Sequence, residues 1–150
     1  MLHIVSGYAP GGSIADWLAD TGPMSEAMVQ RVARYALEGL HHLHDQGVVH
    51  GALHCGNILL GPGTAVRLAD FGLLAIRRPT PGGGDQAMSA LPQAPELESA
   101  FQILPQTDIW ALGCDVVEML TGRPPKRGSM AIRGTLPPLA REVVERCLRP

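Results

Sequence analysis

Two short segments contain the side chains best suited to chemistry. Residues 50–57 read His-Gly-Ala-Leu-His-Cys-Gly-Asn, and residues 69–72 read Ala-Asp-Phe-Gly. Asn57 offers an amide group and Asp70 a carboxylate, both of which can take part in polar interactions. Each residue also has a plainer interpretation, Asp70 as a turn residue and Asn57 as a loop residue bonded to its own backbone.

Two other kinds of site are poorer interpretations of this chain. His50, His54 and Cys55 are metal-binding residue types, but their spacing matches no common zinc pattern. The glycines of residues 81–84 lack the Lys-Ser/Thr pair and the strand-to-helix context of a phosphate-binding loop. Residues 77–93, which contain these glycines and several prolines, are expected to form a loop.

The elements that position the two segments can be predicted from local patterns. Ser25 is a good N-cap and is followed by apolar residues at helical spacing, so we expect a helix over about 26–45. Gly47 is suited to the left-handed position after that helix. Residues 58–60 and 66–68 flank a Gly-Pro-Gly turn and predict a β-hairpin.

Three further helices are expected. Ser13 can cap a brief helix through Leu18, and a final helix is expected over about 138–148. Asp108 is predicted to begin the helix 109–120, which is apolar on nearly every face. Such a helix must lie inside a core.

Composition limits the class of protein. The chain has 150 residues, 45% of them hydrophobic and 17% charged, which is enough to bury a core in one domain or in part of a larger one. A formal net charge of −2 gives no electrostatic case for binding nucleic acid or an anionic membrane. The densest apolar run, 109–120, is too short to span a membrane. The three cysteines form no disulfide framework, so we expect a cytoplasmic protein in a reducing compartment.

These segments together resemble the large, C-terminal lobe of a eukaryotic-type protein kinase, whose loops usually read H-R-D-L-K-x-x-N and D-F-G. Residues 39–44 and 108–114 are similar to its helices E and F, and residues 94–96 read Ala-Pro-Glu. Residues 8–13 are similar to the hinge and helix D of MAP kinase kinase kinases. The motifs occur in the family's order along nearly the whole chain, which makes the resemblance specific.

The resemblance implies a mostly α fold with a small β-hairpin. It describes residues 1–150 as a partial protein kinase domain: hinge, helices D to F, activation segment and truncated C-terminal helices. Because the chain starts at the hinge, the small lobe is absent from it, together with the Gly-rich loop and the strand lysine. Asp108 is implied to bond the backbone of the loop at 50–57.

The loop departs from the family at its reacting positions. Ala52 replaces the aspartate that orients the substrate hydroxyl and accepts its proton, a form of assistance that contributes about 10²- to 10⁴-fold. Gly51 replaces an arginine that binds a phosphate in the activation segment. His54 replaces a lysine that contacts the terminal phosphate. We therefore expect no intact catalytic set in the degenerate loop.

Other histidines have structural interpretations. His50 is implied to pack against Phe71. His41, His42 and His44 lie along helix E and are expected to be surface or helix-end residues.

Part of a nucleotide site is retained. The resemblance places Asn57 and Asp70 at the metal-holding positions. Ala9 would offer its backbone at the hinge, Ser13 would lie near the ribose, and Leu59 would form the floor of the adenine pocket. With the small lobe missing, ATP and Mg²⁺ are expected to bind weakly or not at all.

Three functional hypotheses remain open. The first is a pseudokinase that binds or regulates a protein partner, such as another kinase or a signalling protein. The second is a fragment of an active serine/threonine kinase, and the third is a truncated product without a stable function. Nucleic acid and membranes are not expected partners.

Overall fold

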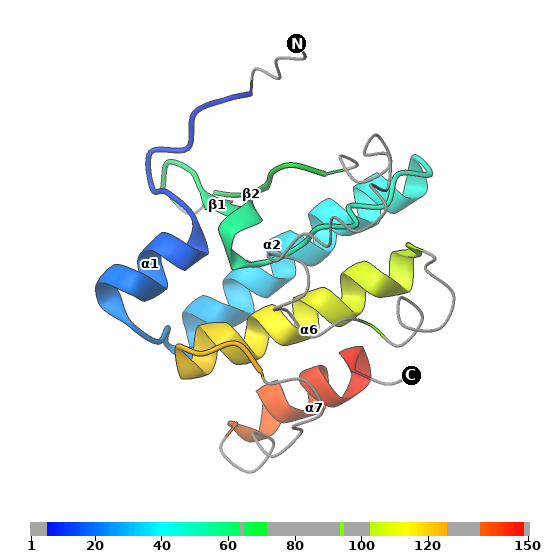
Figure 1. The fold of residues 1–150 in the computed structure, drawn as a ribbon. Helices are drawn as coiled ribbons and strands as arrows, with labels where there is room; N and C mark the ends of the chain where they lie inside the picture. Colours follow the sequence, from blue (N-terminus) through cyan, green and yellow to red (C-terminus); the bar gives the residue numbers. More distant parts are fainter. Residues whose placement is uncertain (1–5, 64, 72–93, 95–102, 126–135, 149–150) are drawn as a thin grey trace, which may run out of the picture.

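The computed structural model describes residues 6–63, 65–71, 94, 103–125 and 136–148. Within these ranges the chain forms the α-helices α1, α2, α6 and α7, a short 3₁₀ helix η1, and one two-stranded antiparallel sheet (Figure 1). The prediction of a mostly α fold with a small β-hairpin is confirmed. The predicted loop over 77–93, and residues Gly72, Pro95 and Glu96 of the two motifs, lie outside the described residues.

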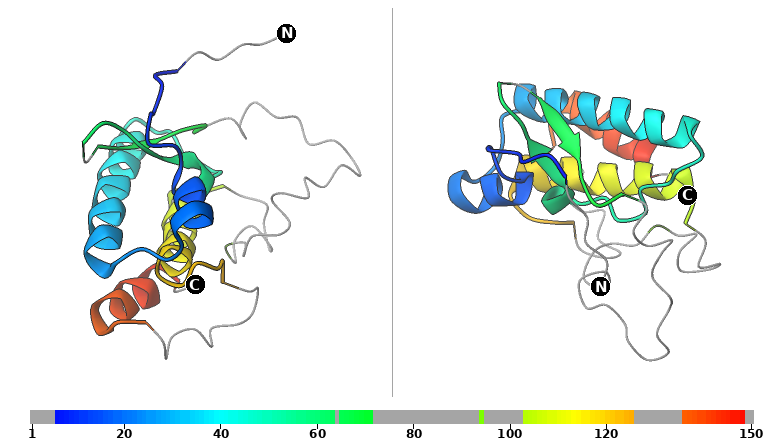
Figure 2. Two further views of the ribbon diagram at one scale, coloured as in Figure 1. Left: turned by 90° about the vertical axis from the view of Figure 1, so that its left-hand side faces the viewer. Right: turned by 90° about the horizontal axis from the view of Figure 1, so that it is seen from above.

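Helix α6 (Pro105–Thr121) is the central element of the described fold. It contacts α2 (Glu26–Asp45), α7 (Pro138–Cys147) and η1 (Cys55–Asn57). Figure 1 shows α6 between α2 and α7, with the hairpin beyond α2. Figure 2 shows from two other sides that α2 and α7 both lie beside α6. Most residues of α6 from Thr107 to Met119 are buried, which confirms the prediction of a core helix.

The start of α6 differs from the prediction. The helix begins at Pro105, so Asp108 lies at the end of its first turn and not at its start. Pro105 suits the first helical position, where its missing N–H would have no helical partner. The hydroxyl of Thr107 accepts the backbone N–H of Leu104 at 3.1 Å and supports this earlier start. The helix ends at Thr121, close to the predicted end at 120, and Gly122 follows as a left-handed C-cap.

The termini of α2 follow the sequence signals. The helix spans Glu26–Asp45, with Ser25 at the N-cap position, although the Ser25 side chain makes no capping hydrogen bond. After the last turn, Gly47 has φ of +71° and donates its N–H to the carbonyl of His44 at 2.9 Å. This left-handed conformation costs a glycine little, so the helix stops there.

The hairpin and α1 form the edge next to η1. Strand β1 (Ile58–Leu60) pairs antiparallel with β2 (Val66–Leu68), and Leu59 lies opposite Arg67. Helix α1 spans Ile14–Thr21, three residues longer at its C-terminal end than predicted, because the chain stays helical until Gly22. The predicted hairpin and the final helix over 138–147 are confirmed.

A single cluster of buried apolar side chains lies between α2, α6 and the hairpin and extends to α7. Gly113 allows α7 to approach α6 closely: a Cβ built at this position would lie 2.7 Å from the Cβ of Cys147 and 3.1 Å from Leu148. Real Cβ atoms essentially never show a contact of 2.7 Å, so the glycine is needed for this packing.

Candidate functional site

The segment 50–57 is fixed to α6 through Asp108. The Asp108 carboxylate accepts the backbone N–H of His50 at 2.9 Å and that of Gly51 at 2.8 Å. Because Asp108 is only 1% exposed, these charge-assisted hydrogen bonds form away from water, where they are stronger. The prediction that Asp108 bonds the backbone of this loop is confirmed.

His44 also contacts the carboxylate of Asp108. Its Nε2 atom lies 2.8 Å from Oδ2 of Asp108, and its side chain is 17% exposed. His41 and His42 are exposed on α2, as expected. His44 is a helix-end residue, which was one of the two expected alternatives, and it is not a surface residue, because the last turn of α2 packs on α6 and turns this side chain toward the buried carboxylate.

His50 is enclosed by the segment that it begins. Its side chain is fully buried, and its ring meets that of Phe71 edge to face, with 6.4 Å between the ring centroids. Nδ1 accepts the N–H of Ala52 at 3.3 Å, while Nε2 has no hydrogen-bond partner among the described residues. Burial lowers the pKa of His50, and the nearby carboxylate of Asp108 opposes this shift. The predicted packing of His50 on Phe71 is confirmed.

The reacting positions of the segment offer little chemistry. Gly51 has no side chain, and Ala52 presents only a methyl group. The Nδ1 atom of His54 accepts the N–H of Gly56 at 3.0 Å, which caps η1. The segment therefore keeps an ordered conformation while contributing no carboxylate of its own.

Asn57 and Asp70 come from adjacent ends of the hairpin. The N–H of Ala69 donates to the carbonyl of Asn57 at 2.9 Å, which brings the residue before Asp70 into contact with Asn57. The side-chain Nδ2 of Asn57 donates to the carbonyl of Ala52 at 2.9 Å. This bond orients the amide so that Oδ1 keeps its acceptor capacity.

Asp70 itself is exposed and has φ of +59°, a left-handed conformation that Asp tolerates better than most residues. One carboxylate and one amide oxygen fit Mg²⁺, which binds through few protein ligands and keeps several waters. The donor chemistry of Asn57 and Asp70 thus suits the metal ion that the resemblance implies.

The hinge-side residues are joined to the hairpin. Gly11 donates its N–H to the carbonyl of Leu60 at 3.0 Å, and Leu60 donates to the carbonyl of Gly12 at 2.8 Å. These bonds set Ser13 opposite Leu59 in an isolated bridge. Ala9 lies one turn earlier and accepts the N–H of Gly12 at 3.2 Å.

Ser13 has a capping role that limits its use in binding. Its hydroxyl donates to the Asp16 carboxylate at 2.7 Å and accepts the N–H of Asp16 at 3.1 Å, which forms a capping box. The hydrogen bond from the Ser13 side chain, followed by that from its backbone, lowers the pKa of Asp16. Asp16 is therefore the exposed polar group at this edge. Sequence reasoning missed it, although the spacing of Ser13 and Asp16 is the signal of such a box.

A second group of polar residues lies where η1 meets α6. Cys55, Asp115 and Glu118 each have one donor atom within 4.8 Å of the others, and this is the only such group of three within the described ranges. His50, His54 and Cys55 do not gather as a metal site. Burial raises the pKa of the Cys55 thiol, and burial together with Glu118 raises the pKa of Asp115. Burial also raises the pKa of Glu118.

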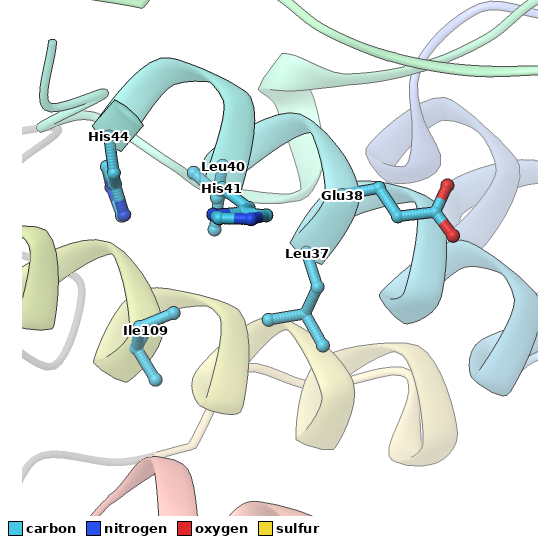
Figure 3. Close-up of a pocket in the computed structure, with 6 residues that line it drawn as sticks. All are labelled: Leu37, Glu38, Leu40, His41, His44 and Ile109. Carbon is cyan, nitrogen blue, oxygen red and sulfur yellow. The ribbon is translucent and has the colours of Figure 1, made fainter. Parts of the chain in front are cut away.

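A shallow groove lies between α2 and α6, beside the contact between His44 and Asp108. Figure 3 shows Leu37 and His44 reaching from α2 toward α6, where Ile109 lies. Six residues line the groove: Leu37, Glu38, Leu40, His41, His44 and Ile109. None of the six belongs to the segments that the sequence connects with phosphate or metal chemistry.

No helix in the part of the chain that the structure describes is both long and apolar enough to cross a membrane.

Comparison with known proteins gives consistent matches. A model of the protein kinase domain matches residues 1–135. Mitogen-activated protein kinase kinase kinase 3 of Mus musculus is 37% identical over 130 residues, which cover 83% of this chain and 21% of that protein. Serine/threonine-protein kinase STE20 of Eremothecium gossypii is 34% identical over 138 residues, covering 88% of this chain and 14% of that protein.

A plant relative matches in the same way. Mitogen-activated protein kinase kinase kinase ANP1 of Arabidopsis thaliana is 35% identical over 127 residues, covering 83% of this chain and 19% of that protein. The chain therefore spans about a fifth or less of the length of these curated relatives.

Proposed function

The chain belongs to the protein kinase domain family, and from this premise we propose that it is a catalytically impaired kinase-like module that acts by binding a protein partner. The proposal rests on one observation: the loop at residues 50–57 is ordered, but the side chain at its catalytic position is inert. Asp108 and Asn57 hold residues 50–57 in place, yet Ala52 presents only a methyl group.

The missing carboxylate matters because of what phosphoryl transfer to a hydroxyl requires. The catalytic-loop aspartate of protein kinases orients the hydroxyl and accepts its proton. Loss of such assistance typically slows a reaction about 10²- to 10⁴-fold. His54 is a weak replacement for a phosphate-binding lysine, since one ring nitrogen already accepts the N–H of Gly56.

Nucleotide binding is the part of the kinase function that the residues still favour, and we propose that it is weak. When bound, Mg²⁺–ATP supplies the transferable phosphoryl group and the metal charge that neutralises it. Asn57 Oδ1 and the Asp70 carboxylate would hold the metal ion. The backbone of Ala9 and the side chain of Leu59 would contact the base. Ser13 would contribute by fixing the Asp16 carboxylate, because its own hydroxyl is engaged in the cap.

A second candidate function has its own support. Asn57 and Asp70 retain the oxygen donors of an active kinase, and the three relatives described above are named serine/threonine-protein kinase or mitogen-activated protein kinase kinase kinase. In this alternative the chain is a fragment of an active serine/threonine kinase that transfers the γ-phosphate of ATP to protein hydroxyls.

The proposed partner is another kinase or a signalling protein in the cytoplasm. The names of the relatives support a signalling role, and exposed aromatic side chains near the hinge and the metal-type residues offer contact area. Tyr8 is 85% exposed and Phe71 is 48% exposed. Aromatic side chains of this kind are enriched in protein interfaces.

Phosphate transfer by the purified full chain tests the proposal. With Mg²⁺–ATP and a generic protein substrate, we expect wild-type labelling to equal that of Asp70→Ala. Metal-dependent labelling well above this control would overturn the proposal and favour the second candidate. Partner binding is tested by adding the chain to a MAP kinase kinase kinase catalytic domain, whose activity we expect to change.

A further inference from the structure

Three acidic groups meet at a place that the proposed nucleotide chemistry does not use. Cys55 of η1 faces Asp115 and Glu118 of α6, and one donor atom of each lies within 4.8 Å of the others. The Sγ atom of Cys55 is 3.6 Å from Oδ1 of Asp115. Cys55 and Asp115 are buried, while Glu118 is half-buried and leaves the group an approach from solvent.

Asp115, the more deeply buried of the two acidic residues, has one carboxyl oxygen without a hydrogen-bond partner among the described residues. Asp115 is 3% exposed, and its Oδ2 atom has no hydrogen-bond partner among the described residues. Its other oxygen faces only the weak thiol donor of Cys55. No lysine, arginine or histidine forms an ion pair with these three side chains in the described ranges. A buried carboxyl oxygen without a partner is costly, and a cation bound among the three side chains would satisfy it.

We propose that Cys55, Asp115 and Glu118 form a structural binding site for one divalent cation of borderline softness, with Zn²⁺ as the best fit. The thiolate and the two carboxylates supply three ligands, and water takes the fourth position. Mg²⁺ and Ca²⁺ are poor candidates because both prefer oxygen ligands alone.

The observed spacing suits a tetrahedral centre. Zn–S bonds of about 2.3 Å and Zn–O bonds of about 2.1 Å at a tetrahedral angle separate sulfur from oxygen by about 3.6 Å. This matches the 3.6 Å between Cys55 Sγ and Asp115 Oδ1. The remaining donor of Glu118 needs only a small side-chain adjustment, because no pair of donors is more than 4.8 Å apart.

The site is independent of the proposed nucleotide site, and its role would be to tie η1 to α6. Cys55 begins η1, whose last residue is Asn57. A cation at Cys55 would therefore add a second attachment of this loop to α6, beyond the one that Asp108 makes. The proposal does not depend on whether Mg²⁺–ATP binds.

Zinc binding to the metal-free full chain tests the site directly. We expect one Zn²⁺ per chain by elemental analysis and by competition with a chromophoric chelator. Loss of an outer-shell partner typically weakens metal affinity about 10- to 100-fold, so we expect loss of a ligand in Cys55→Ala, Asp115→Asn or Glu118→Gln to cost more than about 100-fold. The controls Cys147→Ala and Glu38→Gln should bind as the wild type does.

Cobalt substitution provides a second readout. Co²⁺ bound to the wild type should show a thiolate-to-metal charge-transfer band that is absent in Cys55→Ala and present in Cys147→Ala. Circular dichroism identifies any variant that fails to fold, and Glu118→Gln, at a half-buried position, keeps the test valid if Asp115→Asn unfolds. Equal zinc affinity in Cys55→Ala and Cys147→Ala, or no stoichiometric binding by the wild type, would overturn the proposal.

Discussion

The Nε2 atom of His44 lies 2.8 Å from Oδ2 of Asp108, and this oxygen also accepts the backbone N–H of His50. One carboxylate thus joins the end of α2, the start of α6 and the loop between them in sequence. The arrangement is buried, since Asp108 is 1% exposed. Its loss would affect three elements at once.

Replacing Asp108 should therefore be strongly destabilising. Asp108→Ala leaves the N–H groups of His50 and Gly51 without their acceptor, and an unsatisfied buried polar group costs about 1–3 kcal/mol. We expect the free energy of unfolding to fall by about 3 kcal/mol or more, measured by urea denaturation. Asp45→Ala, which removes an exposed partner of His41, should cost less than about 1 kcal/mol. Similar losses in the two variants would contradict this account of Asp108.

The stability of the chain should depend on pH through His50. Burial lowers the pKa of this residue in the folded state below its ordinary value of 6.5; Asp108 opposes the shift and His54 adds to it. Below pH 6.5 the unfolded chain therefore binds the His50 proton more readily than the folded chain. The contribution of His50 to stability is complete above pH 6.5 and declines as the pH falls toward the folded-state pKa.

The measurement is urea denaturation of the wild type and of His50→Phe between pH 5 and pH 8. The wild type should lose stability on the acid side of this range, and the variant should lose less because it lacks the titrating ring. The same acid dependence in His50→Phe would show that other groups cause it.

Gly113 should not tolerate a larger side chain. In Gly113→Ala the new Cβ would lie 2.7 Å from the Cβ of Cys147, so α6 and α7 would have to move apart. Overpacking of this kind costs about 1–3 kcal/mol. Gly39→Ala in α2 is the matched control, because its Cβ meets only the flexible end of Leu68, at 3.1 Å. Thermal unfolding should show a lower Tm for Gly113→Ala and an unchanged or higher Tm for Gly39→Ala, since alanine favours helices.

Gly51 should resist side chains for a different reason. Its φ of +76° is left-handed, which costs an ordinary residue about 1–2 kcal/mol. Gly51→Ala should lower the free energy of unfolding by about that amount, and Gly51→Asn by less, because Asn tolerates this conformation. Chemical denaturation of both variants tests the order. Equal stability of Gly51→Ala and Gly51→Asn would contradict the explanation that this position requires glycine because of its left-handed backbone conformation.

Most of the fold could be predicted because its signals are local. The caps and apolar spacing of α2, the turn of the hairpin and the apolar length of α6 are all contained in short stretches of sequence. The early start of α6 was missed because Asp108 is also a common residue within a first turn, and the hydrogen bond between Leu104 and Thr107 that supports the earlier start is not evident from residue types alone. The side of α2 that His44 faces depends on the packing of two helices and could not be predicted from residues 26–45 alone.

Part of the candidate site could be predicted from the sequence, and part of it could not. The hydrogen bonds of Asp108 and the packing of His50 on Phe71 followed from family resemblance. The group of Cys55, Asp115 and Glu118 was missed because Cys55 lies 60 residues before Asp115 in the chain. In the sequence, the metal-binding residue types near Cys55 are His50 and His54. No local spacing relates Cys55 to the acidic residues of α6.

Helix α6 contacts residues 50–57 at two places, through Asp108 near His50 and through Asp115 near Cys55. These two acidic residues are separated by about two turns of α6. The helix therefore sets the distance between the part of the loop near His50 and the part near Cys55. The attachment to Asp108 uses the backbone N–H groups of His50 and Gly51, so it needs no reactive side chain in the loop. The side chain at residue 52 can therefore differ without loss of the backbone geometry of the loop, because neither attachment to α6 depends on that side chain.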